Sequence, residues 1–547
     1  IIQNSIYGVD IEKGAVDVAR LRFWLSLIVD EPEPKALPHL DYKIVVGNSL
    51  VSKLDNTIIY VDWNLDETQH GLFGSELAQE RAVILQKISD KQKAVFDPNS
   101  DEEKLSLEIR NLKIDLLCKQ LELMINNQNI PKEPKIADYQ NKTKAKFVQD
   151  QTKYFETIGW QQQITKLQKL KKQPEAPLHF FDWKLDFPEI MNEQVMNKLG
   201  FDIIIGNPPY GAKLNSEEKS FCKSNYTTAK TIKGIQKGSI DTYTLFIELG
   251  HKLTCKGGNL HYIVPISITS SDSMTGIHKL IESDSSLIKV SSYSVRPQPV
   301  FENAVVNTSI LFFKRDGKYC KNIFSTKMYR KNTEINLNHL VRNLEFIDVK
   351  NHKLQGRYPK ISLEIEKNIL TKIFNNKIKI GDLLDKKGEP IFYRTSGGRY
   401  FKVITNYSTG STKEKPIYFN KSISNSIGAI LSSNLYFWFY QIFSNNLDLK
   451  SYEIEIFGVP IDKLDEKVVD KLEKIYKEYL VDIEKNSNVR QADNYVNIES
   501  FREYKIGKSK HIIDKIDDII GPLFGLNQEE INFVKNYEIE FRYSNDE

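Results

Sequence analysis

The segment "FDIIIGNPPYG", residues 201–211, constrains the fold of this chain more than any other stretch. An apolar run ends at Gly206, and an amide, two prolines and an aromatic ring follow. Proline fixes φ and has no N–H, and Pro209 holds Pro208 in an extended conformation. We therefore predict a buried strand that ends in a stiff loop of hydrogen-bond acceptors, which is neither a helix nor an ordinary hairpin.

The first fifty residues have the pattern of strand, helix and strand. "SIYGVDI" (5–11) and "YKIVVGNSL" (42–50) are short apolar runs, and residues 14–29 lie between them. Apolar side chains of this middle segment recur at helical spacing, at Val18, Leu21, Leu25 and Ile28. The pattern is typical of a βαβ unit with parallel strands.

Residues 66–178 differ in composition, because Lys, Glu and Gln dominate them. Apolar residues recur there at helical spacing, for example at Ile109, Leu112, Leu116 and Leu123. Long helices inserted into a sheet domain are expected, with their charges on solvated faces. The aromatic-rich segment "HFFDWKLDFPEI", residues 179–190, closes the insertion.

After residue 211 strands and helices alternate again. A helix is expected from Asp241, strands at 257–265, 287–295 and 306–315, and a helix at 273–283. This alternation predicts the α/β class, with a doubly wound sheet covered by helices on both faces. It fades near residue 336, where a separate α+β domain begins. The predicted division is 1–65 and 179–335 for the sheet domain, 66–178 for the helical insertion and 336–547 for the last domain.

Composition limits the function classes. The net charge of +4 and pI near 8.4 permit a nucleic-acid partner without requiring one. No stretch reaches the roughly 18 apolar residues that a membrane helix needs, so we expect a cytoplasmic protein without a membrane partner. Four dispersed cysteines show neither zinc-site nor disulfide spacing, so no metal site is predicted.

The loop after the strand has the groups that chemistry on an exocyclic amine needs. Ligands bind beyond the carboxyl ends of strands in doubly wound sheets. There the Asn207 oxygen and the Pro208 carbonyl can accept hydrogen bonds from one amino group, and Tyr210 can stack on a planar heterocycle. The alternative is a turn that merely ends a strand, with Tyr210 as packing. The position after Gly206 within this alternation favours the functional interpretation.

"GNPPYG" after "FDIII" resembles motif IV of S-adenosylmethionine-dependent amino methyltransferases. The order of the blocks resembles the gamma group of N6-adenine DNA methyltransferases. The large domains around them are similar to those of type IIG restriction–modification and related phage-defence enzymes. The resemblance implies that Asn207, Pro208, Pro209 and Tyr210 are catalytic.

Three further residues take roles from the resemblance. "IYGVDI" resembles motif II, in which Asp10 would bind the cofactor ribose, and "VVGNSL" resembles motif III, in which Asn48 would contact the cofactor adenine. "PVFENAVVNTSILFF" resembles motif VIII, and implies that Phe301 stacks on the target base opposite Tyr210. Alternatives remain open, since Asp10 could cap the next helix, Asn48 could form a turn and Phe301 could be core.

The implied activity is transfer of a methyl group from S-adenosylmethionine to the N6 amine of an adenine flipped out of double-stranded DNA, at a specific site. The domain at 336–547 would recognise the DNA sequence, with Arg394, Arg399 and Lys402 as candidate DNA-binding residues. The aromatic run "NLYFWFYQIF" in that domain is predicted to be core. The type IIG resemblance also implies an N-terminal nuclease domain in the intact chain, which nothing within these residues shows.

One departure from the family is large. The glycine-rich motif I, which precedes motif II and holds the methionine end of the cofactor, is absent. We therefore expect an N-terminally truncated fragment with weakened or lost cofactor binding. The alternatives are a DNA-recognition fragment without activity of its own, and an NPPY methyltransferase that acts on RNA or on protein glutamine. Compact chains are usual for the latter, so the large last domain disfavours it.

Overall fold

The structure is a computed structural model of the 547-residue chain. It describes residues 5–29, 40–54, 57–63, 65, 72–95, 97, 100–128, 130, 132–139, 144–191, 199–302, 304–332, 336–396, 402–491 and 500–543. The chain divides into two compact units, which are described separately. The first comprises Ile1–Ile203, Lys213–Tyr226 and Leu249–Gly258, and the second Ile204–Ala212, Thr227–Glu248 and Asn259–Glu547.

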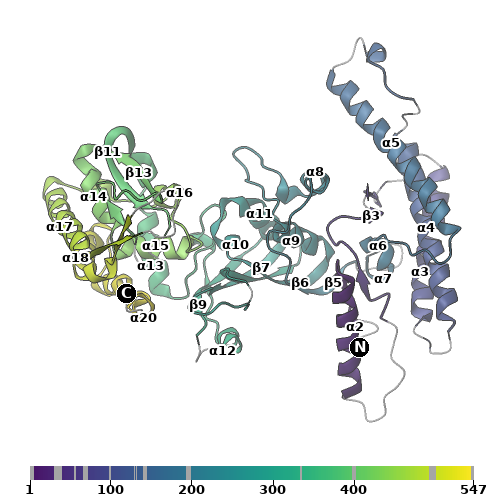
Figure 1. Cartoon of the computed structure of the whole chain (residues 1–547), viewed down its shortest axis with the longest axis horizontal. Coiled ribbons are helices and arrows are strands. Elements are labelled where there is room, and N and C mark those ends of the chain that lie inside the picture. The colour runs from purple at the N-terminus through teal and green to yellow at the C-terminus, as the bar shows by residue number, and fades with distance from the viewer. Residues whose placement is uncertain are drawn as a thin grey trace. The chain divides into compact units, whose positions relative to one another are not determined.

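The predicted βαβ unit is confirmed in the first unit (Figure 1). Strands β1 (Gly8–Asp10) and β2 (Ile44–Val46) pair in parallel, and α2 (Lys13–Val29) connects them. The predicted apolar stripe of α2 is not buried, however: Val18 is 53% and Leu25 52% exposed. Val16 packs with Leu40 and Ile44 instead.

Three long helices form the insertion, namely α3 (Leu72–Ala94), α4 (Glu102–Gln128) and α5 (Lys144–Lys171). Helix α4 packs against both of the others, and Ile88, Leu117 and Leu167 are buried in their common core. The Lys113 ammonium on α4 lies 2.6 Å from the Asp186 carboxylate at the end of α6 (Trp183–Asp186), which ties the insertion to the aromatic segment that follows it. Other elements of this unit are β3 (Lys53–Leu54), β4 (Thr57–Ile58), α7 (Pro188–Met191) and α8 (Ser216–Asn225).

Six strands form one mixed sheet in the order β10-β9-β7-β8-β6-β5. The strands are β5 (Phe201–Gly206), β6 (Thr254–Pro265), β7 (Ser285–Ser294), β8 (Thr308–Arg315), β9 (Asn322–Arg330) and β10 (Ile347–Asp348), with α9 (Thr242–Leu253) and α11 (Thr275–Asp284) between them. Strand β8 runs antiparallel to both β6 and β7, while β7 and β9 are parallel. Residues 295–302 and 304–307 contain no helix, so the described part of this connection lacks the crossover that a parallel strand needs.

The prediction that "FDIIIG" is a buried strand is wrong. Strand β5 lies at the edge of the six-stranded sheet, where it has one neighbour. Ile203 is 65% and Ile205 75% exposed, whereas Ile204 packs against the core. Hydrophobic periodicity shows that a run can be buried, but it does not show where in a sheet the strand lies.

The last part of the chain combines helices with a small sheet. Strand β11 (Leu384–Arg394) pairs antiparallel with β12 (Ile404–Thr405) and with β13 (Glu414–Phe419). The helices are α12 (Leu337–Arg342), α13 (Glu364–Phe374), α14 (Lys421–Leu431), α15 (Asn434–Phe443), α16 (Ser451–Glu455), α17 (Glu466–Lys485), α18 (Lys510–Leu523), α19 (Gln528–Asn536) and α20 (Ile539–Tyr543), and the hairpin β14 (Ser487–Gln491) with β15 (Ser500–Tyr504) follows α17.

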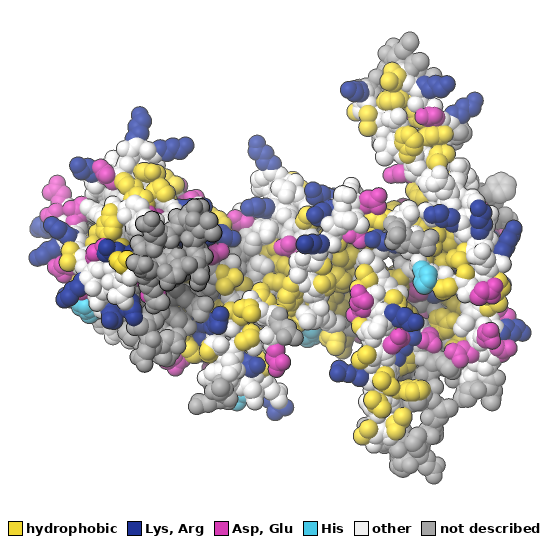
Figure 2. Space-filling model, in the orientation of Figure 1, with side chains coloured by type: hydrophobic (Ala, Val, Ile, Leu, Met, Phe, Trp, Pro, Cys, Tyr) yellow, Lys and Arg dark blue, Asp and Glu magenta, His cyan; other side chains and the backbone are white. Residues whose placement is uncertain are grey.

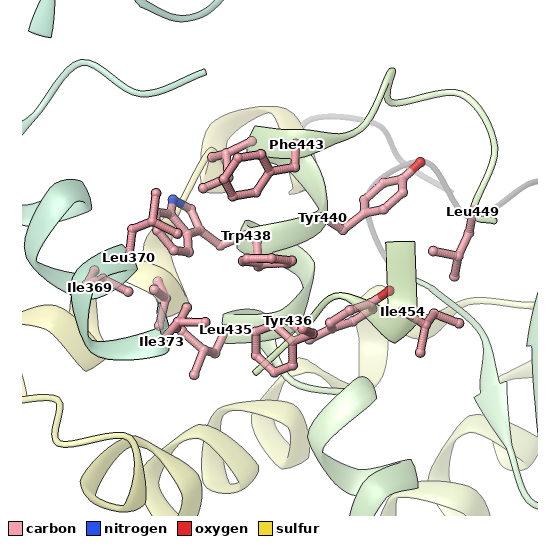
Figure 3. Packing of buried hydrophobic residues seen from close by; sticks show 14 of the residues in the cluster. Ile369, Leu370, Ile373, Leu435, Tyr436, Trp438, Tyr440, Phe443, Leu449 and Ile454 are labelled. Carbon is pink, nitrogen blue, oxygen red and sulfur yellow. The ribbon is translucent and has the colours of Figure 1, made fainter. Parts of the chain in front are cut away.

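Helix α15 lies in the middle of this core, as Figure 3 shows. All ten of its residues are buried, and Leu435, Trp438 and Phe443 pack towards Ile369, Leu370 and Ile373 of α13 (Figure 3). The prediction that "NLYFWFYQIF" is core rather than a stacking platform is therefore confirmed. None of the helices that the structure describes is both long enough and apolar enough to cross a membrane.

Candidate active site

The NPPY loop, residues 207–210, leaves the sheet at the carboxyl end of β5. Gly206 makes the exit tight, because a Cβ there would lie 3.0 Å from Cε1 of Tyr262 on β6. Gly211 ends the loop with φ +66°, a backbone conformation that side chains disfavour. The two glycines thus fix where the loop begins and where it turns away.

The loop presents two acceptors without partners. Asn207 is exposed, and neither its side chain nor the Pro208 carbonyl accepts or donates a hydrogen bond to any residue that the structure describes. The Pro208 ring is buried, so the carbonyl stands on an anchored residue. An amide oxygen and a peptide carbonyl on neighbouring residues can both accept from one amino group.

The Pro209 carbonyl of the loop already accepts a hydrogen bond. Thr242, the first residue of α9, donates its hydroxyl to the Pro209 carbonyl at 2.7 Å and accepts the Ala212 amide at 3.2 Å. The Thr242 side chain is buried, with 2% exposure. One hydroxyl therefore binds the loop on both sides of Tyr210, while the Asn207 side chain and the Pro208 carbonyl have no partner in the described residues.

Tyr210 is held at both its ring and its hydroxyl. The half-buried ring packs against the main core, and the hydroxyl donates to the Ile263 carbonyl of β6 at 3.2 Å. Burial raises the pKa of Tyr210 to about 12, so the phenol is neutral near pH 7. A ring fixed in this way offers a neutral stacking surface beside the acceptors.

Phe301 lies in a turn between β7 and β8. It is half-buried, its carbonyl accepts the Ala304 amide, and the neighbouring Val305 is 73% exposed. Among the described residues, Phe301 and Tyr210 make no ring contact with each other. The structure thus leaves the stacking role of Phe301 a prediction.

In the first unit, Asp10 is the last residue of β1 and Asn48 follows the adjacent strand β2. The Gly47 amide donates to the Asp10 carbonyl at 2.8 Å, so the two residues lie at one edge of the pair. One Asp10 carboxylate oxygen accepts the Glu12 amide at 2.8 Å, and the Asn48 side-chain oxygen accepts the amides of Leu50 and Val51. Asn48 therefore makes the turn contacts that its alternative interpretation expected, while Asp10 bonds to the residue just before α2.

Each of these two side chains also keeps a free group. The second Asp10 carboxylate oxygen and the Asn48 side-chain nitrogen make no hydrogen bond within the described part of the chain. A carboxylate oxygen can accept from ribose hydroxyls, and an amide N–H can donate to a ring nitrogen of adenine. The residues present fit the adenosine part of S-adenosylmethionine.

The three candidate DNA-binding residues differ in their surroundings. The Arg394 guanidinium donates to the Thr409 hydroxyl and the Arg502 carbonyl and lies over the Tyr504 ring, and burial lowers its pKa. Lys402 is 7% exposed, with its ammonium 4.2 Å from the Tyr440 ring centre, so the structure places it in the interior. Arg399 lies outside the described residues.

Sequence reasoning missed Thr242. It identified Asp241 as the start of a helix, and Asp241 does accept the Thr244 amide at the beginning of α9. Nothing local marks the next residue as a partner of a loop about thirty positions earlier. A helix N-terminus that follows a rigid loop is the kind of position where such a contact forms, but side-chain geometry alone reveals it.

Comparison with known proteins identifies the family. Residues 4–301 match the family described as Eco57I restriction-modification methylase. Over 358 residues the chain is 26% identical to a candidate type II restriction enzyme and methyltransferase of Methanocaldococcus jannaschii, covering 61% of this chain and 28% of that protein. Over 214 residues it is 25% identical to the type II restriction enzyme and methyltransferase RM.Eco57I of Escherichia coli, covering 37% and 19%. The chain thus spans less than a third of the length of either relative.

A solved structure shows a weaker likeness. The type IIL restriction-modification enzyme MmeI in complex with DNA aligns over 87% of this chain and 80% of its own, with 11% identity and a TM-score of 0.40. These values are too low to bear on the assignment, which rests on the family match over more than half of the chain. The chain belongs to the Eco57I restriction-modification methylase family.

Proposed function

We propose that this chain carries the methyl-transfer site and the DNA-recognition domain of a restriction–modification enzyme. The substrate is an adenine in double-stranded DNA, the methyl donor is S-adenosylmethionine and the product is N6-methyladenine. Family membership supports the methyltransferase class, and the resemblance of residues 201–211 to motif IV supports the exocyclic amine of adenine as the target.

The observation that carries the proposal is the selective use of acceptors in the NPPY loop. The Pro209 carbonyl is occupied by Thr242, while the Asn207 side chain and the Pro208 carbonyl have no partner in the described chain. Because the loop is fixed at both ends, these two adjacent acceptors keep their relative position and are available to a ligand. Open acceptors on a rigid loop suit a ligand with two N–H groups on one atom.

The chain's residues would orient the amine and bind the base. A base inside a duplex cannot reach the loop, so it has to flip out, which costs a few kcal/mol. Stacking on Tyr210 offsets part of this cost, and the Asn207 and Pro208 oxygens accept the two amine hydrogens. Their lone pairs then stabilise the positive charge that grows on nitrogen as it attacks.

The cofactor would be held by the free groups of Asp10 and Asn48. When bound, S-adenosylmethionine supplies an electrophilic methyl group on a sulfonium sulfur. The Asn207 and Pro208 oxygens would orient the amine nitrogen for this transfer, in which the thioether would be the leaving group and one amine proton would pass to solvent. No covalent bond to the protein is needed, so orientation by the loop supplies much of the acceleration.

The test is a methylation assay with nucleoside analysis. The protein is incubated with methyl-labelled S-adenosylmethionine and unmethylated duplex DNA, and the DNA is digested for mass spectrometry. Labelled N6-methyladenine is expected with the wild type, and its loss with Asn207→Ala. Asn488→Ala, at an exposed position of β14 far along the chain, is the matched control and should keep the activity.

Other outcomes separate the alternatives. Label in RNA or in a protein glutamine instead of DNA would contradict the proposed substrate, as would label on cytosine. Since the chain spans only part of its relatives, an inactive chain is followed by the same assay on the complete gene product. Activity that appears only there leaves the chain as a base-binding and recognition portion, and absence of activity there rejects the proposal.

A further inference from the structure

A loop of the second unit, residues 227–240, carries positive charge without any acid. Its sequence "TTAKTIKGIQKGSI" contains Lys230, Lys233 and Lys237 and no Asp or Glu. All three lysines are exposed, and none of their ammonium groups makes an ion pair or hydrogen bond within the described residues. Figure 2 shows Lys and Arg side chains projecting near the position where Figure 1 labels α11. We call residues 227–240 the lysine loop.

The base of the lysine loop is rigid. Glu248 of α9 has no exposed surface, and it accepts hydrogen bonds from the amides of Thr227 and Thr228, at 3.0 and 2.9 Å, and from both of their hydroxyls. Gly238 passes so close to the other side of the loop that a Cβ would lie 2.4 Å from the Ala229 carbonyl oxygen. Glu248 thus fixes the start of the loop on α9, and the close approach of Gly238 to Ala229 holds the two ends of the loop together.

The tip is fixed as well. Ile232 and Gln236 exchange both backbone hydrogen bonds at 2.9 Å, and Gly234 turns the chain between them with φ +74°. The Gln236 side-chain amide donates to the carbonyls of Thr227 and Lys230. Lys279 on α11 donates to the Ile235 carbonyl, which braces the tip from outside. The backbone that carries the three lysines is therefore already ordered before a ligand binds.

Helix α9 links the lysine loop to the NPPY loop. Two residues after its end, Thr242 donates to the Pro209 carbonyl and accepts the Ala212 amide. Glu248, six residues further along α9, anchors the start of the lysine loop. Residues in the first two turns of α9 thus contact both the NPPY loop, which carries the open acceptors, and the lysine loop, which carries the cations.

We propose that the lysine loop binds backbone phosphates of the DNA strand that carries the target base. This rests on the proposed function. Lysine is a point charge without the bidentate geometry that reads base edges, so these contacts add affinity and salt dependence rather than sequence specificity. Holding the phosphates beside a flipped nucleotide keeps the strand in place while its base lies against the NPPY loop.

The exposed Ile232 and Ile235 on the same loop would also suit a protein partner. Charge favours DNA, because three exposed ammonium groups without an ion pair in the described residues match a polyanion. A protein partner is therefore an outcome that the test has to separate from DNA.

The experiment compares DNA binding by the wild type and by Lys230→Gln/Lys233→Gln/Lys237→Gln at several salt concentrations. Each phosphate contact adds about 0.9 to the slope of log affinity against log salt, so the triple variant should lose up to about 2.7. Between 50 and 200 mM salt the wild type should then lose roughly 40-fold more affinity than the variant. The same change of charge on α17, Lys467→Gln/Lys471→Gln/Lys474→Gln, is the control and should leave the slope unchanged; these lysines are exposed and lie among acidic residues.

The readout is fluorescence anisotropy of a labelled duplex, which needs neither cofactor nor methyl transfer. An unchanged slope in the lysine-loop variant, or an equal change in the α17 control, overturns the phosphate assignment. Loss of binding to another protein with unchanged DNA affinity overturns it in favour of a protein partner. If the wild type binds no duplex DNA at 50 mM salt, the proposed function fails as well. If the wild type methylates DNA but the triple variant has an unchanged salt slope, only the phosphate-binding role of the lysine loop is rejected.

Discussion

Replacing Thr242 by valine should slow methyl transfer without weakening DNA binding. Valine keeps the branched shape but removes the hydroxyl that donates to the Pro209 carbonyl at 2.7 Å and accepts the Ala212 amide at 3.2 Å. Two backbone groups then lose their partner on either side of Tyr210. The loop that carries the Asn207 and Pro208 oxygens becomes free to move relative to α9.

The size of the effect follows from the two lost hydrogen bonds. A hydrogen bond contributes about 0.5–1.5 kcal/mol net, and a buried group left unpaired costs about 1–3 kcal/mol. Pro209 and Ala212 are exposed, so water can replace part of what is lost, and we take about 1–2 kcal/mol. If this disfavours the reactive loop geometry, kcat falls roughly 5- to 30-fold, since 1.36 kcal/mol is tenfold in rate.

The assay is single-turnover methylation at saturating DNA and cofactor, together with the KM for DNA. Thr242 is buried and offers DNA nothing, so KM should change little, and Thr242→Ser, which keeps the hydroxyl, should restore most of the rate. The melting temperature should drop by only a few degrees, which excludes unfolding as the cause. A valine variant with wild-type kcat, or a serine variant as slow as valine, would refute the reasoning.

Three further predictions concern other residues. Tyr210→Phe loses the hydrogen bond to the Ile263 carbonyl but keeps the ring. Its methylation rate should stay within about tenfold of the wild-type rate, because one hydrogen bond contributes about 1 kcal/mol. The rate of Tyr210→Ala, which loses the ring as well, should fall further. In a protein that binds S-adenosylmethionine, Asp10→Asn keeps the acceptor for the Glu12 amide but loses the charge. Calorimetry should show affinity about 10- to 100-fold weaker, and unchanged affinity would favour the helix-capping role. Burial lowers the pKa of His278 to about 4, and the ring, stacked on Tyr358, faces Glu282 and Lys353. The unfolded state binds the proton more tightly, so this part of the stability, about 3 kcal/mol, is present above pH 6.5 and lost as pH falls towards 4. Urea unfolding at pH 7 and pH 4.5 should show a smaller acid loss for His278→Gln than for wild type, and equal losses would contradict the assignment.

The local sequence pattern predicted the positions of strands and helices better than it predicted which of their side chains are buried. The strands at Gly8–Asp10 and Ile44–Val46 and the helix between them were predictable, because apolar spacing and strand-end residues are local signals. The burial of "FDIIIG" was not, since edge position depends on which strands pair far along the chain. The expectation that the apolar stripe of α2 is buried is wrong for the same reason. Residue spacing identifies an apolar helix face but does not show which element covers that face.

The candidate site was predictable in kind but not in detail. The sequence indicates a rigid loop of acceptors, because proline chemistry acts within a few residues. It does not indicate which acceptor is occupied, since Thr242 and Pro209 are 33 positions apart and meet only in the folded chain. Lys402 shows the converse, because it was a candidate DNA-binding residue, while the fold buries it with its ammonium beside the Tyr440 ring.

The central claim is that the open acceptors of the NPPY loop direct a methyl group to the exocyclic nitrogen of adenine. The most direct measurement uses duplex DNA with ¹⁵N at N6 of adenine and a deuterated methyl donor, followed by fragmentation mass spectrometry of the nucleosides. The account predicts methyladenine whose heavy methyl group stays with the heavy nitrogen, and its disappearance in Asn207→Ala. A methyl group on a ring nitrogen, on cytosine, or at wild-type yield in the variant would contradict it.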